Sequence, residues 1–231
     1  MIARRMVLSG AVAAALMAVA VSPAWTQEKT APAPTPQTAN SEPAAVEPRY
    51  DALLAQAKRD GAAVDFKALR YAYADSEHYN PYDAKESELR TSMVKAYRDK
   101  NCVTAMKHAQ VILDKNYVDI DAHMMMDLCY RRLDQPQQAR QHELMAHGLA
   151  ESVIATGDGR TPQTAFVVIA VREEYNVIAM LGLKQLQQAL IRADGHSYDQ
   201  FSVKTESGGT DTIFFNIDRP LTWLAQKTTN R

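Results

Sequence analysis

Apolar side chains recur every three or four positions through residues 50–156, which is the spacing that places them on one face of an α-helix. We expect a short helix that carries Tyr50 and Leu53 and ends at Asp60, followed by a second helix that begins after Asp65. A turn-rich break, SEHYNPYD, comes next. Four longer helices should follow, over residues 86–99, 102–115, 119–133 and 136–156.

The four longer helices contain a near-repeat with an offset of about 34 residues. Ala105 recurs as Ala139 and His108 as His142, and a tyrosine precedes each alanine. The segment resembles the tetratricopeptide repeat, in which an aromatic side chain of helix A and a small alanine of helix B lie where the two helices are closest. His123 departs from that pattern, because the repeat has a larger aromatic side chain there. The resemblance implies a concave face suited to a peptide or a partner subunit.

The pattern changes after Gly157-Asp158-Gly159, which we expect to end the last of these helices. The apolar run over residues 165–171 predicts a buried strand, and residues 172–181 are expected to form a helix. Three further strands are expected over residues 184–192, 198–204 and 210–218, with a hairpin turn at Ser207-Gly208-Gly209. The expected fold class is therefore α+β, with tetratricopeptide-like helical hairpins followed by a small β-α-β-β-β region that packs on them.

The first residues have the pattern of an export signal. Arg4 and Arg5 precede an uncharged apolar stretch from Met6 to Val21, which is too short to span a bilayer. We expect a signal peptide over residues 1–24 with cleavage after Ala24, and therefore a periplasmic or secreted protein. The alternative is a retained membrane anchor. No later apolar run is long enough to cross a membrane, so no membrane span is expected after cleavage.

Residues 25–48 are rich in Pro, Ala and Thr and contain almost no large apolar side chains, so we expect a disordered linker. The rest of the chain divides into a helical-repeat region, residues 49–156, and a small α+β region, residues 157–231. The formal net charge of the whole chain is −1. Because the sequence shows no clustered basic face, we expect no nucleic acid among its partners.

Cys102 and Cys129 are the only cysteines of the chain, and an exported protein meets an oxidising compartment. Cys102 begins one predicted helix and Cys129 lies late in the next, antiparallel helix, so the two stand at about the same height on neighbouring helices. We expect a disulfide between them, provided that both side chains face the shared seam. The alternative is that both pack as small buried residues of the repeat.

The candidate metal-binding side chains have simpler interpretations as packing residues. His142 and His147 flank a glutamate as in a zinc-protease helix, in which the two histidines are four residues apart. Here the spacing is five residues, which leaves the rings about 140 degrees apart around the helix. His123 and Asp127 have suitable spacing without an evident third ligand. The methionines at 124–126 could suggest copper, but consecutive helix positions point in different directions and favour packing. We expect no metal and no cofactor.

One polar segment of the α+β region is a candidate catalytic site. If the protein is an enzyme, His196 is expected to act as a general base that Asp199 orients. Other carboxylates of the region could lie nearby, namely Glu173, Glu174 and Asp218. The same Asp-Gly-His-Ser sequence is also ordinary turn chemistry, which we favour over catalysis.

Short motifs along the whole chain carry a second resemblance. They are Tyr50-Asp51-Ala52-Leu53-Leu54, Val64-Asp65-Phe66, Leu69-Arg70, Tyr79-Asn80-Pro81-Tyr82, Gly157-Asp158-Gly159, Thr164-Ala165-Phe166 and Phe215-Asn216-Ile217-Asp218. With them the chain resembles the bacterial family known as domain of unknown function 4919, over essentially all of residues 49–223. The resemblance implies an exported protein without an assigned activity, so no catalytic residue is carried over.

These observations together favour a non-enzymatic interaction or scaffold protein of the bacterial envelope. Such a protein is expected to bind an unidentified protein or peptide partner through its helical repeats. The alternative is a small envelope hydrolase with its site around His196.

Overall fold

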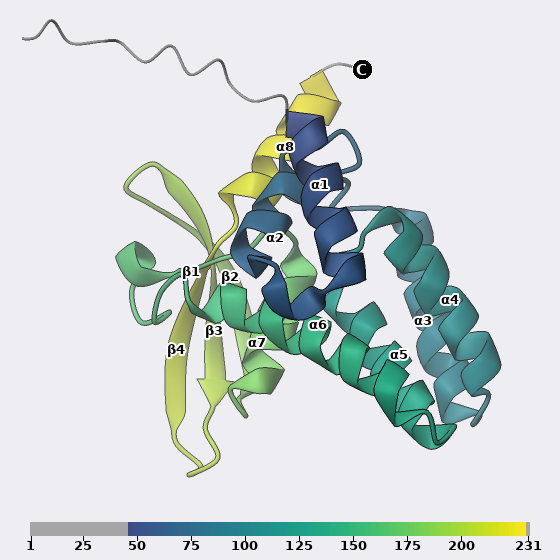
Figure 1. The fold of residues 1–231 in the computed structure, drawn as a ribbon. Helices are drawn as coiled ribbons and strands as arrows, with labels where there is room; N and C mark the ends of the chain where they lie inside the picture. The colour runs from purple at the N-terminus through teal and green to yellow at the C-terminus, as the bar shows by residue number, and fades with distance from the viewer. Residues whose placement is uncertain (1–45, 230–231) are drawn as a thin grey trace, which may run out of the picture. The chain divides into compact units, whose positions relative to one another are not determined.

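Six α-helices form the first part of the described chain, which comprises residues 46–229 of the computed structural model (Figure 1). Their bounds are α1 (Val46–Arg59), α2 (Phe66–Ala74), α3 (Ala84–Arg98), α4 (Cys102–Lys115), α5 (Ile120–Arg132) and α6 (Pro136–Ile154), with a 3-10 turn, η1 (Gly61–Ala63), after α1. All six predicted helices are present, and α4 has its expected bounds. The predicted signal peptide, its cleavage site and the linker up to residue 45 lie outside the described residues.

Aspartate and asparagine side chains fix where four of these helices begin. Asp65 Oδ1 accepts a hydrogen bond from the backbone of α2 at 2.9 Å, and Asn101 Oδ1 accepts one from the backbone of α4 at 3.0 Å. Asp83 and Asp119 cap α3 and α5 in the same way. Such caps satisfy amide groups that have no partner within the first turn of a helix. The starts of these helices are therefore encoded locally in the sequence.

The helical hairpins α3/α4 and α5/α6 pack around small side chains. Ala105 of α4 and Ala139 of α6, the two alanines of the near-repeat, are fully buried. Cys102 and Cys129 are also buried, but they are free thiols that do not lie at bonding distance, so the expected disulfide is wrong. Burial and a hydrogen bond with Cys102 raise the pKa of Cys129 to about 12. The two cysteines therefore face the same α4–α5 seam as packed thiols.

Four strands form one mixed sheet in the order β1-β4-β3-β2. Their bounds are β1 (Phe166–Val167), β2 (Lys184–Ala193), β3 (His196–Lys204) and β4 (Thr210–Asn216), with α7 (Val171–Met180) between β1 and β2 and α8 (Asp218–Thr229) after β4. β1 is parallel to β4, and the other neighbours are antiparallel. The predicted α+β class and the β-α-β-β-β order are confirmed.

The first and the last strand end earlier than predicted. The apolar run over residues 165–171 forms a strand of only two residues, because Val171 already begins α7. Within that run, the amide of Ile169 donates to the Glu173 side chain at 2.9 Å and not to a neighbouring strand. The last strand ends at Asn216, two residues earlier than expected, because α8 begins at Asp218.

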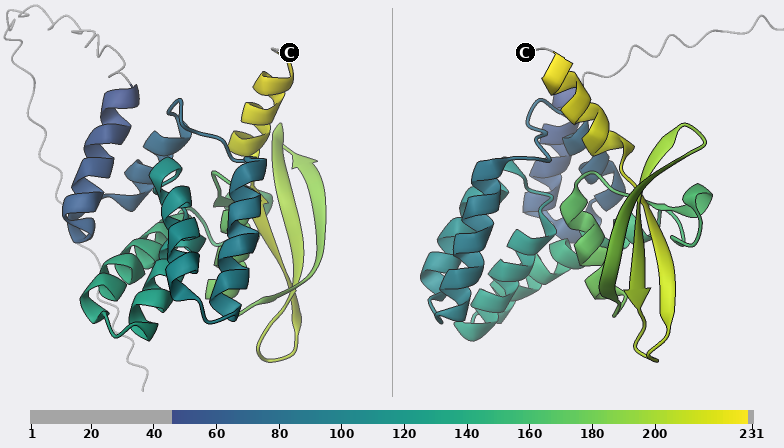
Figure 2. Two further views of the ribbon diagram at one scale, coloured as in Figure 1. Left: turned by 90° about the vertical axis from the view of Figure 1, so that its right-hand side faces the viewer. Right: turned by 180° about the vertical axis from the view of Figure 1, so that it is seen from behind.

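A buried ion pair joins the helices to the sheet. Arg70 of α2 and Glu173 of α7 are linked from Nε to Oε1 at 2.8 Å and from Nη2 to Oε2 at 2.6 Å. Their side chains are 0% and 6% exposed. Figure 2 shows α7 between the helices and the sheet, where it contacts both. This helix therefore connects the two regions that form the site described below.

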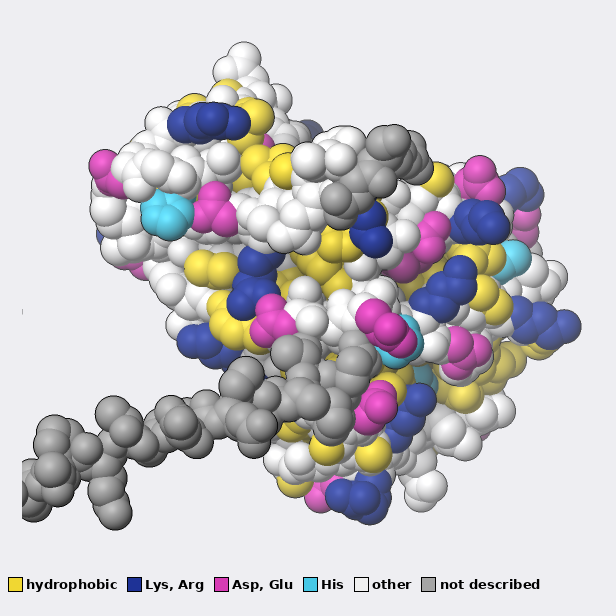
Figure 3. All heavy atoms as spheres, turned by 90° about the horizontal axis from the view of Figure 1, so that it is seen from above, with side chains coloured by type: hydrophobic (Ala, Val, Ile, Leu, Met, Phe, Trp, Pro, Cys, Tyr) yellow, Lys and Arg dark blue, Asp and Glu magenta, His cyan; other side chains and the backbone are white. Residues whose placement is uncertain are grey.

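The surface carries charges of both signs. On the face shown in Figure 3, basic and acidic side chains are interspersed and do not gather into one basic patch. Within residues 46–229, no helix is both long and apolar enough to cross a membrane.

Candidate functional site

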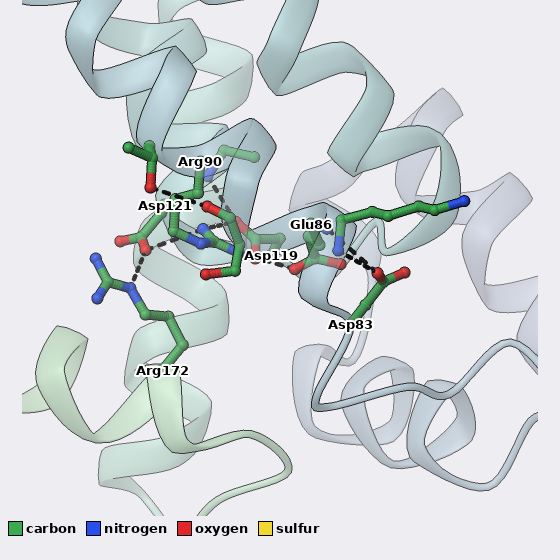
Figure 4. Close-up of polar contacts among 10 residues, drawn as sticks. Asp83, Glu86, Arg90, Asp119, Asp121 and Arg172 are labelled. Atoms are coloured by element: carbon green, nitrogen blue, oxygen red, sulfur yellow. Dashed lines mark hydrogen bonds and ion pairs between the residues drawn. The ribbon is translucent and has the colours of Figure 1, made fainter.

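Arg90 is the centre of a polar network where α3 meets the start of α5 (Figure 4). Its guanidinium group contacts both carboxylate oxygens of Asp119, with Nη2–Oδ2 at 2.6 Å and Nη1–Oδ1 at 3.0 Å. The same group contacts Asp121 at 3.0 Å and Glu86 at 2.8 Å. A single guanidinium group is therefore shared by three carboxylates.

Three helices begin beside this network. Glu86 lies in the first turn of α3, Asp119 caps α5, and Arg172 is the second residue of α7. Arg172 Nε lies 2.5 Å from Asp121 Oδ2, so the network extends to α7. Asp119 Oδ1 also accepts a hydrogen bond from the backbone of α5 at 2.7 Å. Because it both caps a helix and binds the Arg90 guanidinium, this carboxylate is held in one position.

Two cavities adjoin the network and share part of their lining. The shared residues are Tyr73, Tyr79, Asn80, Asp83 and Glu86. The first cavity, of about 360 Å³, extends to Arg90, Arg172 and Tyr175. The second cavity, of about 450 Å³, extends to Tyr50 and Trp223. We call the two together the cleft, and cavities of this size accommodate one or two side chains of a partner or a small ligand.

Glu86 has an unusual protonation equilibrium. Burial and the negative charge of Asp119 raise its pKa to about 7, and the positive charge of Arg90 only partly offsets them. The Glu86 carboxyl group therefore binds a proton more readily than an ordinary glutamate. An additional positive charge in the cleft would favour its ionised form.

Two amide oxygens in the cleft have no hydrogen-bond donor. Asn80 Oδ1 and Asn116 Oδ1 are buried and accept no hydrogen bond from the described part of the chain. Asn80 lines both cavities, and Asn116 lines the first. A buried acceptor without a donor typically costs about 1–3 kcal/mol.

His196 is held by Asp218 and not by Asp199, which corrects the pairing expected from the sequence. His196 Nδ1 lies 2.6 Å from Asp218 Oδ2, and Asp218 Oδ1 accepts a hydrogen bond from Ser197 N at 2.8 Å. Successive strand residues point to opposite faces of a sheet, so Asp199 lies on the other face of β3. There it accepts a hydrogen bond from Gln188 Nε2 at 2.8 Å.

The surroundings of His196 offer little for nucleophilic catalysis. A cavity of about 430 Å³ lies beside it, and none of the described residues that line this cavity is a serine or a cysteine. The hydroxyl of Thr156, which does line it, donates to one backbone carbonyl at 2.6 Å and accepts from one backbone amide at 2.8 Å. Asp194 and Gly195 connect β2 to β3 with φ angles of 50° and 82°, which is the geometry of a tight hairpin turn.

A buried carboxyl pair lies between α7 and β3, away from the cleft lining. Glu174 is fully buried, and neither of its carboxyl oxygens meets a donor among residues 46–229. Burial and the neighbouring Asp199 carboxylate raise the pKa of Glu174 to about 9. Glu174 is therefore protonated at neutral pH and can donate a hydrogen bond to Asp199. The sequence indicated both residues as chemically interesting but not their contact, which depends on how α7 packs on the sheet.

His123 and His142 form a second pair that the sequence did not predict. Their Nδ1 atoms lie 2.9 Å apart, and His123 Nε2 lies 2.9 Å from the carbonyl oxygen of Tyr117. Because a carbonyl can only accept, neutral His123 carries its proton on Nε2, and His142 donates through Nδ1. Burial lowers the pKa of both imidazoles to about 4. Both rings are therefore neutral at neutral pH.

The structure gives the other metal candidates different surroundings. His142 and His147 line different cavities. Met125 and Met126 are buried in the helical core, whereas Met124 is 47% exposed, as the directions of consecutive helix positions require. Across the described residues, no three His, Cys, Asp or Glu side chains gather as a metal site.

Comparison with known proteins gives one match. A family model, described as Domain of unknown function (DUF4919), matches residues 41–226. No curated protein and no solved structure matches the chain. The matched stretch includes all the residues that the two cavities share.

Proposed function

This chain belongs to the DUF4919 family, a domain of unknown function, and we propose that it is an exported, non-enzymatic interaction protein of the bacterial envelope. Its partner is a protein or a peptide that inserts side chains into the cleft beside Arg90. Export is supported by the sequence, in which Arg4 and Arg5 precede a short apolar stretch and the small residues around Ala24.

The observation that carries this proposal is the convergence of three helix starts on one open cleft. The charged groups of the network come from α3, α5 and α7, and they are held by one another before any partner arrives. Such preorganisation reduces the entropy that binding must overcome. Beside them, Tyr82 is 39% exposed and lines the first cavity, so an aromatic surface is available for packing.

The alternative, a small hydrolase around His196, has less support in the geometry. The His196–Asp218 contact could orient an imidazole as a general base. However, the same Asp218 carboxylate also binds Ser197 N at the start of β3 and begins α8, which gives it a structural role. The hydroxyl of Thr156 beside it is already engaged by backbone groups.

A pair of matched substitutions on α3 tests the proposal. Ser87 and Ser92 are both exposed, but only Ser87 lines the cleft. Envelope fractions would be passed over the immobilised mature protein and its two variants, and the retained proteins would be quantified by mass spectrometry. We expect Ser87→Arg to lose a partner that both the parent protein and Ser92→Arg retain. Equal retention by the two variants would contradict binding in the cleft.

A further inference from the structure

The second cavity has a lining of aromatic rings. Tyr50 and Tyr73 lie with ring centroids 5.5 Å apart, and Tyr73 meets Tyr79 edge-on at 5.8 Å. Tyr79 in turn meets Trp223 of α8 edge-on at 6.4 Å. All four residues line the cavity, so an almost continuous row of rings borders it. The face of an aromatic ring carries a negative electrostatic potential that attracts cations.

Carboxylates outnumber cations around the same cavity. The carboxylates are Asp51, Asp83, Glu86 and Asp114, and the cations are Lys115 and Lys227, while Glu77 and His78 of the lining are engaged in contacts of their own. Glu86 belongs to the network of Figure 4, where it shares Arg90 with two aspartates. The cavity therefore has a surplus of negative charge next to aromatic rings.

One ammonium group already uses this chemistry. Lys227 Nζ lies over the ring of Trp223, 5.5 Å from its centroid. The contact comes from an exposed side chain one turn further along α8, and within residues 46–229 no lysine or arginine lies over the rings of Tyr50, Tyr73 or Tyr79.

We propose that the second cavity binds the ammonium or guanidinium group of a lysine or arginine side chain presented by the partner. The aromatic rings receive the alkyl chain and the cation, and the carboxylates accept the hydrogen bonds. This inference rests on the proposed function, because it names the side chain that a partner bound in the cleft inserts. An acidic side chain would meet repulsion from the carboxylates at the same place.

A small probe tests the cation subsite without knowledge of the partner. The ¹⁵N-labelled mature protein would be titrated with N-acetyl-lysine methylamide while the indole N–H signal of Trp223 is followed by NMR. The signal would be assigned with Trp223→Phe. We expect a saturable shift with the lysine probe and no comparable shift with the neutral N-acetyl-norleucine methylamide. Equal shifts with the two probes, or no shift with either, would overturn the proposal.

Matched glutamate variants identify the carboxylate responsible. Glu86→Gln should weaken binding of the lysine probe about tenfold, which corresponds to about 1.4 kcal/mol. Glu88→Gln, on an exposed position of the same helix, should leave it unchanged. Asp51→Asn provides a second, exposed cavity variant if Glu86→Gln unfolds the chain, and it should also weaken binding. Unchanged binding in both cavity variants would overturn the assignment.

The outcome is distinguishable from that of the proposed function. If Ser87→Arg loses the partner while the lysine probe fails to bind, the cleft binds a partner by other contacts and the cation subsite is wrong. If the lysine probe binds but Ser87→Arg retains the same envelope proteins as the parent, the cation subsite is present and the proposed interaction in the cleft is wrong.

Discussion

Arg70 Nε lies 2.8 Å from Glu173 Oε1 within the interior of the protein, although the two residues are 103 positions apart in the chain. Arg70 Nη1 also lies 3.3 Å from Ser152 Oγ, and Arg70 Nη2 lies 3.2 Å from the carbonyl oxygen of Val167. One guanidinium group thus connects α2, α6, β1 and α7. Because Glu173 also lines the first cavity, this ion pair helps to position the cleft.

Arg70→Ala should destabilise the protein strongly, because it leaves the Glu173 carboxylate buried without its cation. Breaking one side of a buried ion pair typically costs about 3–5 kcal/mol. The double variant Arg70→Leu/Glu173→Leu should lose less than the single variant, since it leaves no buried charge. Urea denaturation followed by circular dichroism measures both free energies of unfolding. If the free energy of unfolding of Arg70→Ala were less than about 1 kcal/mol below that of the parent, the ion pair would not be important for stability.

Glu174→Gln should stabilise the protein near neutral pH. The folded-state pKa of Glu174 is about 9, above the ordinary value of 4.5 for a glutamate, so the folded chain binds a proton that the unfolded chain releases. The stability from this group is fully present below about pH 4.5 and is lost as pH rises towards about 9. The amide removes this titration while keeping a donor for Asp199.

The gain for Glu174→Gln over the parent should be near zero at pH 4.5 and grow to about 2–3 kcal/mol at pH 7. Urea midpoints at several pH values measure it. Glu151→Gln, an exposed position on α6, is the control for the substitution itself. A difference between parent and Glu174→Gln that does not change with pH would contradict the raised pKa.

His123 and His142 should make the protein sensitive to acid. Their folded-state pKa of about 4 lies below the ordinary value of 6.5 for a histidine, so the unfolded chain binds protons that the folded chain does not. Their stability contribution is present above about pH 6.5 and is lost as pH falls to about 4, by up to about 3 kcal/mol for one imidazole. His142→Asn keeps a donor to His123 and should reduce this loss, as measured by urea midpoints between pH 4 and pH 7. The exposed His147→Asn is the control, and identical pH profiles for parent and His142→Asn would contradict the assignment.

The helices were predictable because their signals are local. Asp65, Asn101 and Asp119 accept hydrogen bonds from the first turns that follow them, and Pro136 begins α6 where its missing N–H has no consequence. α8 was missed although Pro220 lies in its first turn, which is a position that favours a helix start. The apolar run ending at Val171 was predicted too long as a strand because hydrophobicity alone does not distinguish a strand from buried residues leading into a helix.

The site was harder to predict because its contacts are long-range. Asp119 and Asp121 lie at the start of α5, Arg90 lies on α3, and Arg172 lies on α7. Because these residues are far apart in the chain, no sequence spacing predicts their contacts. The sequence paired His196 with Asp199, but strand alternation places these two side chains on opposite faces of the sheet, and Asp218 contacts the His196 imidazole instead.

His196→Ala should leave both the fold and partner binding intact. The substitution removes one hydrogen bond from a half-exposed imidazole, which typically contributes about 0.5–1.5 kcal/mol. Thermal unfolding would measure the loss in stability, and the capture experiment with envelope fractions would measure binding. Loss of the captured partner in the folded variant would show that the His196 surface, and not the cleft alone, takes part. A hydrolytic activity that His196→Ala abolishes without unfolding would favour the hydrolase alternative.

Photocrosslinking in the cleft tests the central claim most directly. A benzophenone amino acid would replace either Tyr82, which lines the first cavity and is 39% exposed, or Val103, which lies on α4 and is 60% exposed. The two variants would be expressed in the producing bacterium, irradiated in intact cells and analysed by mass spectrometry. Binding in the cleft predicts a crosslinked protein or peptide at position 82 that is absent at position 103 and disappears when Ser87→Arg is added. No adduct at position 82, or the same adducts at both positions, would contradict it.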